Sequence, residues 1–255
     1  MASSSSDGSR HESYINVLSN AEVQDFSREH QIDGTDAKFL IDWAAAVNDV
    51  TKHPRVVALV EAATKGENAV GAATAVKNKA AAIAREMGAM LSRRLVSATY
   101  VVTHTMMKRL YTGVICERGQ LAAFAELCKR AHVQGRSVIF LPSHKSHIDY
   151  IVACFVVNSF GLGSPAIAAG DNLNIFLLGK FLRRNGAFFI RRSFTGPDSE
   201  LYTAVVAAYV EGLMRRGANL KFFLEGGRSR TGKLLEPKIG MLGMLLEPIL
   251  AGTVD

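Results

Sequence analysis

The sequence contains few cysteines, and none lies close to another along the chain. Cys116, Cys128 and Cys154 form no C-x-x-C pair, and their number is odd. Scattered cysteines of this kind are typical of reduced thiols in an intracellular protein, whereas a disulfide framework or a cysteine-rich metal site needs paired spacings. A functional site must therefore be sought among other residue types.

The chain also lacks a long apolar run and a secretory signal. Its opening residues, MASSSSDGSRHES, have no charged start followed by an apolar stretch, so they predict a disordered leader over residues 1–20. The closest approach to a spanning segment, residues 150–170, is broken by Asn158-Ser159 and by GLGSP. Because a spanning helix needs about 20 consecutive apolar residues, we expect none, which leaves attachment to a membrane surface open.

Negative charge is in short supply, and the formal net charge is +7. Such an excess of positive charge favours an anionic partner, which could be a nucleic acid, a phosphorylated metabolite or an anionic membrane surface. Many soluble proteins, however, carry a similar excess. The arginines near the motifs described below follow apolar runs and lie beside glycines. They are not interleaved with aromatic residues on one face, so we expect no nucleic-acid partner.

The character of the sequence changes near residue 110. Residues 21–110 read as a helical region, and the proline-free run AAAIAREMGAMLSRRLVSATYVVTHTMMKRL favours one or two helices within residues 54–109. We expect this region to pack on the core. The alternative is a basic amphipathic segment on a membrane surface. The residues that would then face lipid headgroups are Arg85, Arg93, Arg94, Lys108 and Arg109.

Residues 111–255 alternate between short apolar runs and helical patterns. The expected strands cover residues 136–142, 164–170, 186–192 and 219–227. The expected helices cover residues 146–157, 174–184, 198–216 and 240–250. This alternation predicts an α/β fold, in which a sheet is flanked by helices and ligands gather at the carboxyl ends of the strands.

The first candidate site follows the strand expected at 136–142. In LPSHKSHIDY, Ser146-x-x-Asp149 matches a capping box and predicts a helix that starts at Ser146. His144 would then lie in the loop, within reach of Asp149 in the first helical turn. A carboxylate on one imidazole nitrogen makes the other nitrogen a general base, although Asp149 could also be a simple helix N-terminal carboxylate. No G-x-S-x-G elbow exists, and His144 with His147 lacks a third ligand, so we expect neither a serine hydrolase nor a metal site.

Two further candidates also follow expected strands. GAFFIRR ends in Arg191 and Arg192, and LEGGRSRTGK resembles the phosphate loop of nucleotide hydrolases. Leu234 occupies the position where that loop needs Ser or Thr to hold magnesium, so a nucleotide site is not expected. Arginine forks bind phosphate oxygens in pairs, and glycines let the backbone approach a ligand, so the loop favours a simpler phosphate.

In combination, the three blocks resemble the glycerol-3-phosphate and dihydroxyacetone-phosphate acyltransferases. That family carries H-x-x-x-x-D, G-x-[IF]-F-I-R-R and F-x-E-G-x-R-S-R in this order. The blocks are found here at residues 144–149, 186–192 and 223–230, and AAGDNLN (168–174) and EPKIGML (236–242) also resemble the family. The likeness covers residues 105–255 and implies a helical N-terminal subdomain followed by an acyltransferase-type mixed sheet.

The resemblance implies that His144 takes the proton from the acceptor's primary hydroxyl, oriented by Asp149, as the hydroxyl attacks an acyl-CoA thioester. It implies sn-1 acylation of glycerol 3-phosphate or dihydroxyacetone phosphate, the first step of glycerolipid or ether-lipid synthesis. Acyl-CoA would be a co-substrate, and no cofactor or metal is implied. The residues expected to bind the acceptor phosphate or line its pocket are Arg191, Arg192, Glu225, Gly226, Arg228, Ser229, Arg230 and Lys145.

Two features depart from the family pattern. Lys145 stands where the family usually has Arg, which keeps the charge but loses the planar fork. The family's fourth block should follow EPILAGTVD, so we expect the catalytic domain at 111–255 to be truncated. The alternatives left open are a lysophospholipid acyltransferase, against which GGRSRTG argues, and a non-catalytic lipid-binding remnant. We expect a peripheral attachment to an intracellular membrane, which could be that of the mitochondrion, the endoplasmic reticulum or the peroxisome.

Overall fold

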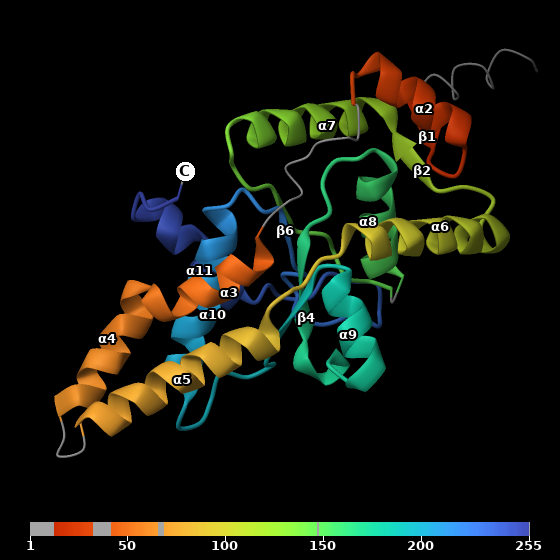
Figure 1. Cartoon of the computed structure of the whole chain (residues 1–255). Coiled ribbons are helices and arrows are strands. Elements are labelled where there is room, and N and C mark those ends of the chain that lie inside the picture. The colour runs from red at the N-terminus through yellow and green to blue at the C-terminus, as the bar shows by residue number, and fades with distance from the viewer. Residues whose placement is uncertain (1–12, 33–41, 66–68, 147, 255) are drawn as a thin grey trace, which may run out of the picture.

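The computed structural model describes residues 13–32, 42–65, 69–146 and 148–254. Its centre is a sheet of four parallel strands in the order β3-β6-β4-β5. The strands are β3 (Ile139–Phe140), β4 (Ala166–Gly170), β5 (Ala187–Ile190) and β6 (Leu220–Lys221). Each falls inside a run expected to be a strand, and helices connect them (Figure 1). The expected α/β fold is therefore confirmed.

Four helices follow the strands. They are α8 (Asp149–Ser159), α9 (Phe176–Arg184), α10 (Ser199–Met214) and α11 (Ile239–Leu250). Most residues of α10 are buried, on all sides of the helix, which fits its apolar character. Tyr209 shows how α10 is held: its hydroxyl accepts the Ala89 N–H at 2.9 Å, and its ring meets Phe188 of β5 edge-on. The helix therefore lies between the sheet and the N-terminal helices.

The N-terminal helices pack on the other side of α10. They are α3 (Trp43–Asp49), α4 (Pro54–Ala62) and α5 (Ala69–Met87), with 3₁₀ turns η2 (Val50–Lys52) and η3 (Ala63–Lys65). The next helix, α6 (Arg93–Leu110), packs on α8 instead. Residues of α3, α4 and α5 share one hydrophobic core with α10, the sheet and α11 (Figure 1). The helical region and the sheet therefore form one packed body.

Residues 54–109 form three helices rather than the one or two expected. The break between α5 and α6 comes from tertiary contacts: Met90 N–H bonds the Arg183 carbonyl at 3.0 Å, and Ser92 N–H bonds the Arg184 carbonyl at 2.8 Å. Gly88, directly after α5, lets the chain approach α3 closely at the same point, because a Cβ there would lie 2.6 Å from Cγ2 of Val47. Bonds to a distant segment thus replace helical bonds that the local sequence favours.

A second core lies on the α8 side of the sheet. It is built around α2 (Asn20–Glu29), α6, α7 (Arg118–Val133) and α8, and around an antiparallel pair of strands, β1 (Tyr14–Asn16) and β2 (Ile115–Glu117). Strand β1 corrects the expectation of a disordered leader over residues 1–20. Residues 1–12 lie outside the described part, but Ile15 is fully buried and the backbone of β1 pairs with β2, which the polar start of the chain does not reveal.

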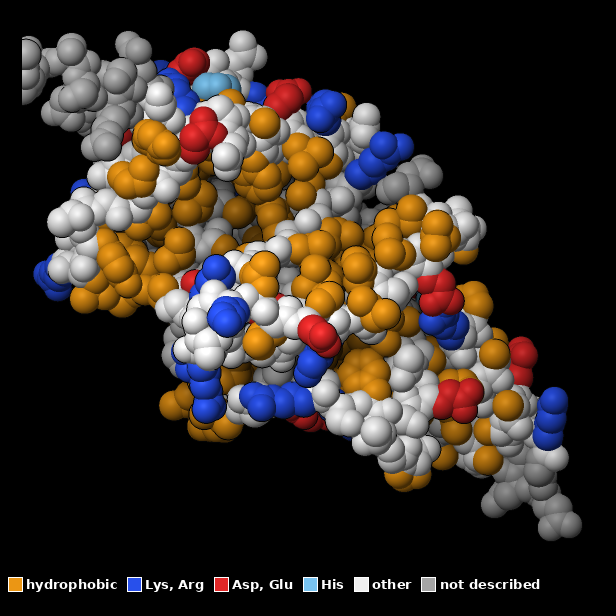
Figure 2. All heavy atoms as spheres, turned by 180° about the vertical axis from the view of Figure 1, so that it is seen from behind, with side chains coloured by type: hydrophobic (Ala, Val, Ile, Leu, Met, Phe, Trp, Pro, Cys, Tyr) orange, Lys and Arg blue, Asp and Glu red, His pale blue; other side chains and the backbone are white. Residues whose placement is uncertain are grey.

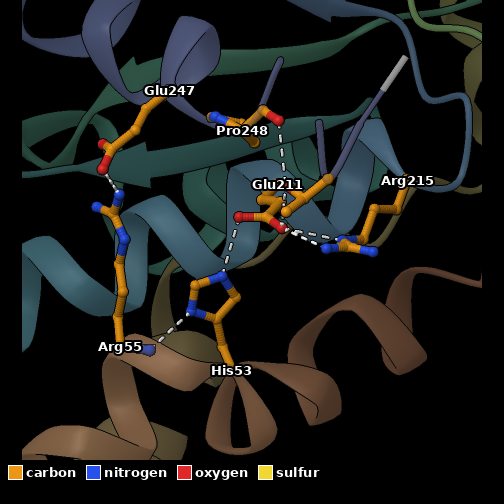
Figure 3. Close-up of polar contacts among 7 residues, drawn as sticks. His53, Arg55, Glu211, Arg215, Glu247 and Pro248 are labelled. Carbon is orange, nitrogen blue, oxygen red and sulfur yellow. Dashed lines mark hydrogen bonds and ion pairs between the residues drawn. The ribbon is translucent and has the colours of Figure 1, made fainter. Parts of the chain in front are cut away.

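A polar clasp joins α4, α10 and the end of α11 (Figure 3). The Glu211 carboxylate accepts hydrogen bonds from Nε2 of His53 at 3.0 Å, from Arg215 at 2.7 and 3.0 Å, and from Thr253 at 3.1 Å. Nδ1 of His53 accepts the Arg55 N–H at 3.3 Å and so caps α4, which leaves the ring proton on Nε2. Arg55 also pairs with Glu247 of α11. None of the helices in the described ranges is both long and apolar enough to cross a membrane.

Candidate active site

All four strands of the main sheet are parallel, so their carboxyl ends meet at one edge. The segments that follow are residues 141–148 after β3, 171–175 after β4, 191–198 after β5 and 222–238 after β6. The expected site residues lie in three of these segments or at the start of α8. They are His144, Lys145, Asp149, Arg191, Arg192, Glu225, Gly226, Arg228, Ser229 and Arg230. The fold thus brings the three sequence blocks to one edge.

His144 and Asp149 face each other, with 3.4 Å between Nδ1 and Oδ2. His144 lies in the loop and Asp149 begins α8, as the capping pattern requires, although α8 starts three residues later than expected. Oδ2 of Asp149 also accepts the backbone N–H groups of Lys145 and Ser146 at 2.6 Å each. These bonds hold the preceding residues in a turn, which delays the helix.

The environment keeps Asp149 ionised. Burial raises the pKa of its carboxyl, but the backbone N–H groups of Ser146 and Lys145 and the His144 ring together outweigh burial and lower the pKa below its ordinary value. An ionised carboxylate at Nδ1 holds the ring proton on that nitrogen and leaves the lone pair of Nε2 as a proton acceptor. The side chains of His144 and Asp149 are 20% and 27% exposed, so a substrate can reach them.

Glu225 joins two of the loops. Its Oε1 accepts the His144 N–H at 2.7 Å and its Oε2 accepts the Leu235 N–H at 3.0 Å. Both hydrogen bonds lower the pKa of the Glu225 carboxyl, and the bond from the His144 N–H has the larger effect. We expected Glu225 in the acceptor pocket, but both of its oxygens face backbone donors. Its place in the structure is that of a brace between the loop after β3 and the loop after β6.

The loop after β6 supports His144 from two more directions. Ser229 N–H bonds the His144 carbonyl at 2.8 Å, and the buried Ser229 hydroxyl has no partner among the described residues. The Phe223 ring stacks on the imidazole, with centroids 4.1 Å apart and planes at 20°. Phe223 was not singled out as a site residue. The sequence did offer a signal for its orientation. Neighbouring residues in a strand point to opposite faces of the sheet, so Phe222 and Phe223 had to lie on opposite sides.

The arginines divide into two sets. Arg191 and Arg192 are exposed; the Arg191 guanidinium lies 4.3 Å from the centroid of the Tyr202 ring, and Nε of Arg192 bonds Asn172 at 3.2 Å. The side chains of Arg228 and Arg230 have no hydrogen bond or ion pair within the described ranges.

The remaining two expected residues also belong to this edge. Lys145 is exposed, and Gly226 has a positive φ of 60° at a point where a Cβ would meet the Lys238 side chain at 2.7 Å. Several cations with free donors therefore lie at one edge beside the His144–Asp149 pair. In the described part of the chain, His, Cys, Asp and Glu side chains form no group of three or more that could hold a metal ion.

Comparison with known proteins agrees with this geometry. The family model described as "Acyltransferase" matches residues 124–253, about half of the chain. A "Glycerol-3-phosphate acyltransferase" of Shewanella denitrificans is 41% identical over 66% of this chain and 20% of its own length. A relative of the same name from Actinobacillus succinogenes is 35% identical over 82% of this chain and 24% of its own length. Another from Shewanella woodyi is 47% identical over 50% of this chain and 16% of its own length. The chain thus spans about a fifth of the length of these relatives. It belongs to the acyltransferase family, and its three motifs resemble those of the glycerol-3-phosphate acyltransferases.

Proposed function

We propose that this chain transfers a long-chain acyl group to the primary hydroxyl of glycerol 3-phosphate, with acyl-CoA as donor. The observation that carries the proposal is the His144–Asp149 pair at 3.4 Å, on the same sheet edge as the guanidinium groups of Arg228 and Arg230, which have no partner among the described residues. A general base beside free cations suits an acceptor that carries both a hydroxyl and a phosphate. The names of the relatives favour glycerol 3-phosphate over dihydroxyacetone phosphate.

In the proposed mechanism, Nε2 of His144 takes the proton of the acceptor hydroxyl while the oxygen attacks the thioester carbonyl. The new C–O bond forms, the C–S bond breaks, and the imidazolium returns its proton to the thiolate of CoA. Asp149 stabilises the imidazolium between these two transfers. Acid–base assistance of this kind contributes about 10²–10⁴-fold to a rate. The scheme needs no covalent acyl-enzyme, metal or cofactor.

The arginines would hold the acceptor phosphate so that its hydroxyl faces Nε2. Arg191, Arg228 and Arg230 are the principal candidates, and Lys145 and Arg192 lie at the same edge. Bidentate guanidinium–phosphate pairs fix orientation as well as affinity, and orientation is what a proton transfer to one ring nitrogen requires. Glu225 acts in this scheme by holding His144 rather than by binding the phosphate.

We also propose that the protein works at an intracellular membrane surface. One face carries a broad area of apolar side chains with Lys and Arg beside it (Figure 2). On α9 and the segment before it, Ile175, Phe176 and Leu177 are 61%, 77% and 73% exposed, next to Lys180 and Arg184. These apolar side chains lie at the start of α9, at the same sheet edge as His144. That position would let an acyl chain pass from a lipid surface to the site.

The experiment that tests the proposed function measures CoA release from palmitoyl-CoA. Glycerol 3-phosphate and dihydroxyacetone phosphate are offered in parallel, and H144A is the control variant. We expect release that depends on glycerol 3-phosphate and falls about 10²–10⁴-fold in H144A, with an unchanged circular dichroism spectrum. Release in H144A above about a tenth of wild type would refute the mechanism. CoA release only with a lysophospholipid acceptor would favour a lysophospholipid acyltransferase. Binding of acyl-CoA without any CoA release would favour a non-catalytic lipid-binding protein.

A further inference from the structure

Tyr202 connects the start of α10 to the end of β5. It lies in the first turn of α10 and is only 3% exposed. Its hydroxyl accepts the backbone N–H of Arg191 at 2.8 Å. The Arg191 guanidinium lies over the same ring, with its central carbon 4.3 Å from the ring centroid. One side chain therefore contacts both the backbone and the charged end of a single arginine.

The Tyr202 ring is itself held in place. The Phe194 ring meets it edge-on, with centroids 5.0 Å apart and planes at 81°. The Tyr202 N–H bonds the Asp198 carbonyl at 2.9 Å, and the Asp198 carboxylate pairs with Lys79 of α5 at 2.6 Å. Burial raises the pKa of Tyr202, so its ring is a neutral phenol and its contact with Arg191 is of the cation–π kind. The ring is thus a fixed platform for a guanidinium group.

This contact leaves the hydrogen-bond donors of Arg191 available. A guanidinium has five N–H donors, and a cation–π contact uses its charge without satisfying them. Within the described ranges, the Arg191 side chain has no hydrogen bond or ion pair. The next residue differs, because Nε of Arg192 donates to Asn172 at 3.2 Å. Of the two consecutive arginines, Arg191 is therefore the one that can offer its whole donor fork to a ligand.

We propose that Tyr202 is a positioning residue that holds Arg191 ready for the acceptor phosphate, and that Arg191 rather than Arg192 is the principal phosphate ligand of this pair. The inference rests on the proposed function and deepens it. An exposed arginine loses side-chain freedom when it binds a ligand, and an arginine already held on a ring has lost part of that freedom beforehand. Arg191 is exposed, so a ligand can reach its guanidinium.

The charges around Arg191 favour an anion at this place. Asp171 and Glu86 lie near the Tyr202 hydroxyl, but both are exposed, and neither pairs with Arg191 in the described part of the chain. On the other side, β5 lies two strands from β6, which is about 10 Å at about 4.8 Å per strand. The arginines of the loop after β6 and Arg191 therefore approach a common region. A phosphate carries a charge of about −1.5 to −2 at neutral pH and would relieve the repulsion between them.

The test measures the dissociation constant of glycerol 3-phosphate by NMR, from the amide signals of the full chain without an acyl donor. Y202L removes the hydroxyl and the ring and should weaken binding at least about tenfold, whereas Y202F keeps the ring and should weaken it about threefold. Y209F is the matched control. Tyr209 lies on the same helix and its hydroxyl accepts a backbone N–H at 2.9 Å, but its ring meets Phe188 instead of an arginine. Y209F should change the constant by less than about twofold.

A double-mutant cycle separates an effect through Arg191 from a general structural effect. In the R191A background, Y202L should change the dissociation constant by less than about twofold, because the guanidinium that Tyr202 positions is gone. R192A should weaken binding less than R191A does, because Nε of Arg192 is already bonded to Asn172. If Y202L does not give a native amide spectrum, Y202M replaces it, since methionine adapts to irregular spaces in a core.

An unchanged dissociation constant in folded Y202L would overturn the proposal. A loss of equal size in the R191A background, or in Y209F, would overturn it as well. Each of these results would leave the proposed function standing if CoA is still released. Binding that depends on Tyr202 and Arg191, without CoA release, would support the positioning role and count against acyl transfer by this chain. A wild-type chain that binds no glycerol 3-phosphate would overturn both.

Discussion

The Glu225 carboxylate accepts the backbone N–H of His144 at 2.7 Å, although the two residues are 81 positions apart in the chain. The bond exists because β6, the last strand in sequence, lies next to β3, the first strand of the same sheet. The loop that holds the candidate base is thereby tied to the loop that holds Arg228 and Arg230.

Removal of this tie should lower the rate rather than weaken acceptor binding. In E225A the His144 N–H loses its acceptor and the loop loosens, so we expect kcat to fall at least about tenfold with KM for glycerol 3-phosphate changed less than about threefold. E236A, an exposed glutamate of the same loop, serves as the matched control. Steady-state kinetics measures both constants. A raised KM at constant kcat would show instead that Glu225 contacts the acceptor.

The same carboxylate should make stability depend on pH. The backbone bonds from His144 and Leu235 hold the pKa of Glu225 below its ordinary value of 4.5. Because the pKa is lowered in the folded state, the ionised Glu225 carboxylate adds to the free energy of unfolding at neutral pH. This added stability is lost as the pH falls through the pKa of the folded state. The free energy of unfolding in urea, compared between wild type and E225Q, should therefore differ by a constant amount above pH about 5.5 and by less below about 4.5. A difference that grows on acidification would contradict this assignment.

Arg228 should contribute mainly to acceptor affinity. Its guanidinium is partly buried and has no protein partner among the described residues, so a phosphate would be its first strong ligand. Hydrogen bonds to a charged group contribute about 1.5–3 kcal/mol, so R228A should raise KM for glycerol 3-phosphate by about 10–100-fold. KM for the acyl donor should stay constant. R130A, on the exposed side of α7, is the control, and an equal effect of both variants would refute the assignment.

The apolar start of α9 should be the part that meets a lipid surface. Co-sedimentation with vesicles of anionic and neutral phospholipids compares the double variant F176S/L177S with the control V101S/V102S. Val101 and Val102 are 62% and 68% exposed and lie on α6, the helix that carries most of the basic residues first considered for membrane contact. We expect the α9 variant to lose at least about tenfold in binding to anionic vesicles and the α6 variant to keep most of it. The reverse order would assign the membrane contact to α6.

The Glu211 clasp should affect stability without affecting the site. E211A removes the acceptor of His53, Arg215 and Thr253 together, and it leaves the His53 Nε2–H without its partner. We expect the free energy of unfolding in urea to fall by about 2 kcal/mol, because these are hydrogen bonds to a charged, mostly buried group. E61A, on exposed α4, should change it by less than about 0.5 kcal/mol. Equal values for the two variants would mean that the clasp contributes nothing measurable.

Much of this arrangement was predictable from local sequence. Each expected strand of residues 111–255 has an observed counterpart, because apolar runs bounded by glycine and polar residues leave few alternatives. The offset from His144 to Asp149 also predicted a loop residue facing a first-turn carboxylate, and the structure places them so. Local pattern was sufficient where the contact partners are close in sequence.

Contacts between distant segments could not be predicted in this way. The stacking of Phe223 on His144 and the bonds of Glu225 depend on the strand order, which no window of sequence contains. The break between α5 and α6 has the same origin, since residues 90 and 92 bond the backbone at 183 and 184. Strand β1 was missed because its partner, β2, lies about 100 residues later.

The burial of α10 on all sides has a consequence for modularity. The family match begins at residue 124, but the outer face of α10 is covered by α3, α4 and α5, which precede that point. A version of the protein that started at the family boundary would leave Tyr209 without its Ala89 partner and would expose a row of apolar side chains to water. The stretch that the family model matches is therefore smaller than the unit that buries α10 in this protein.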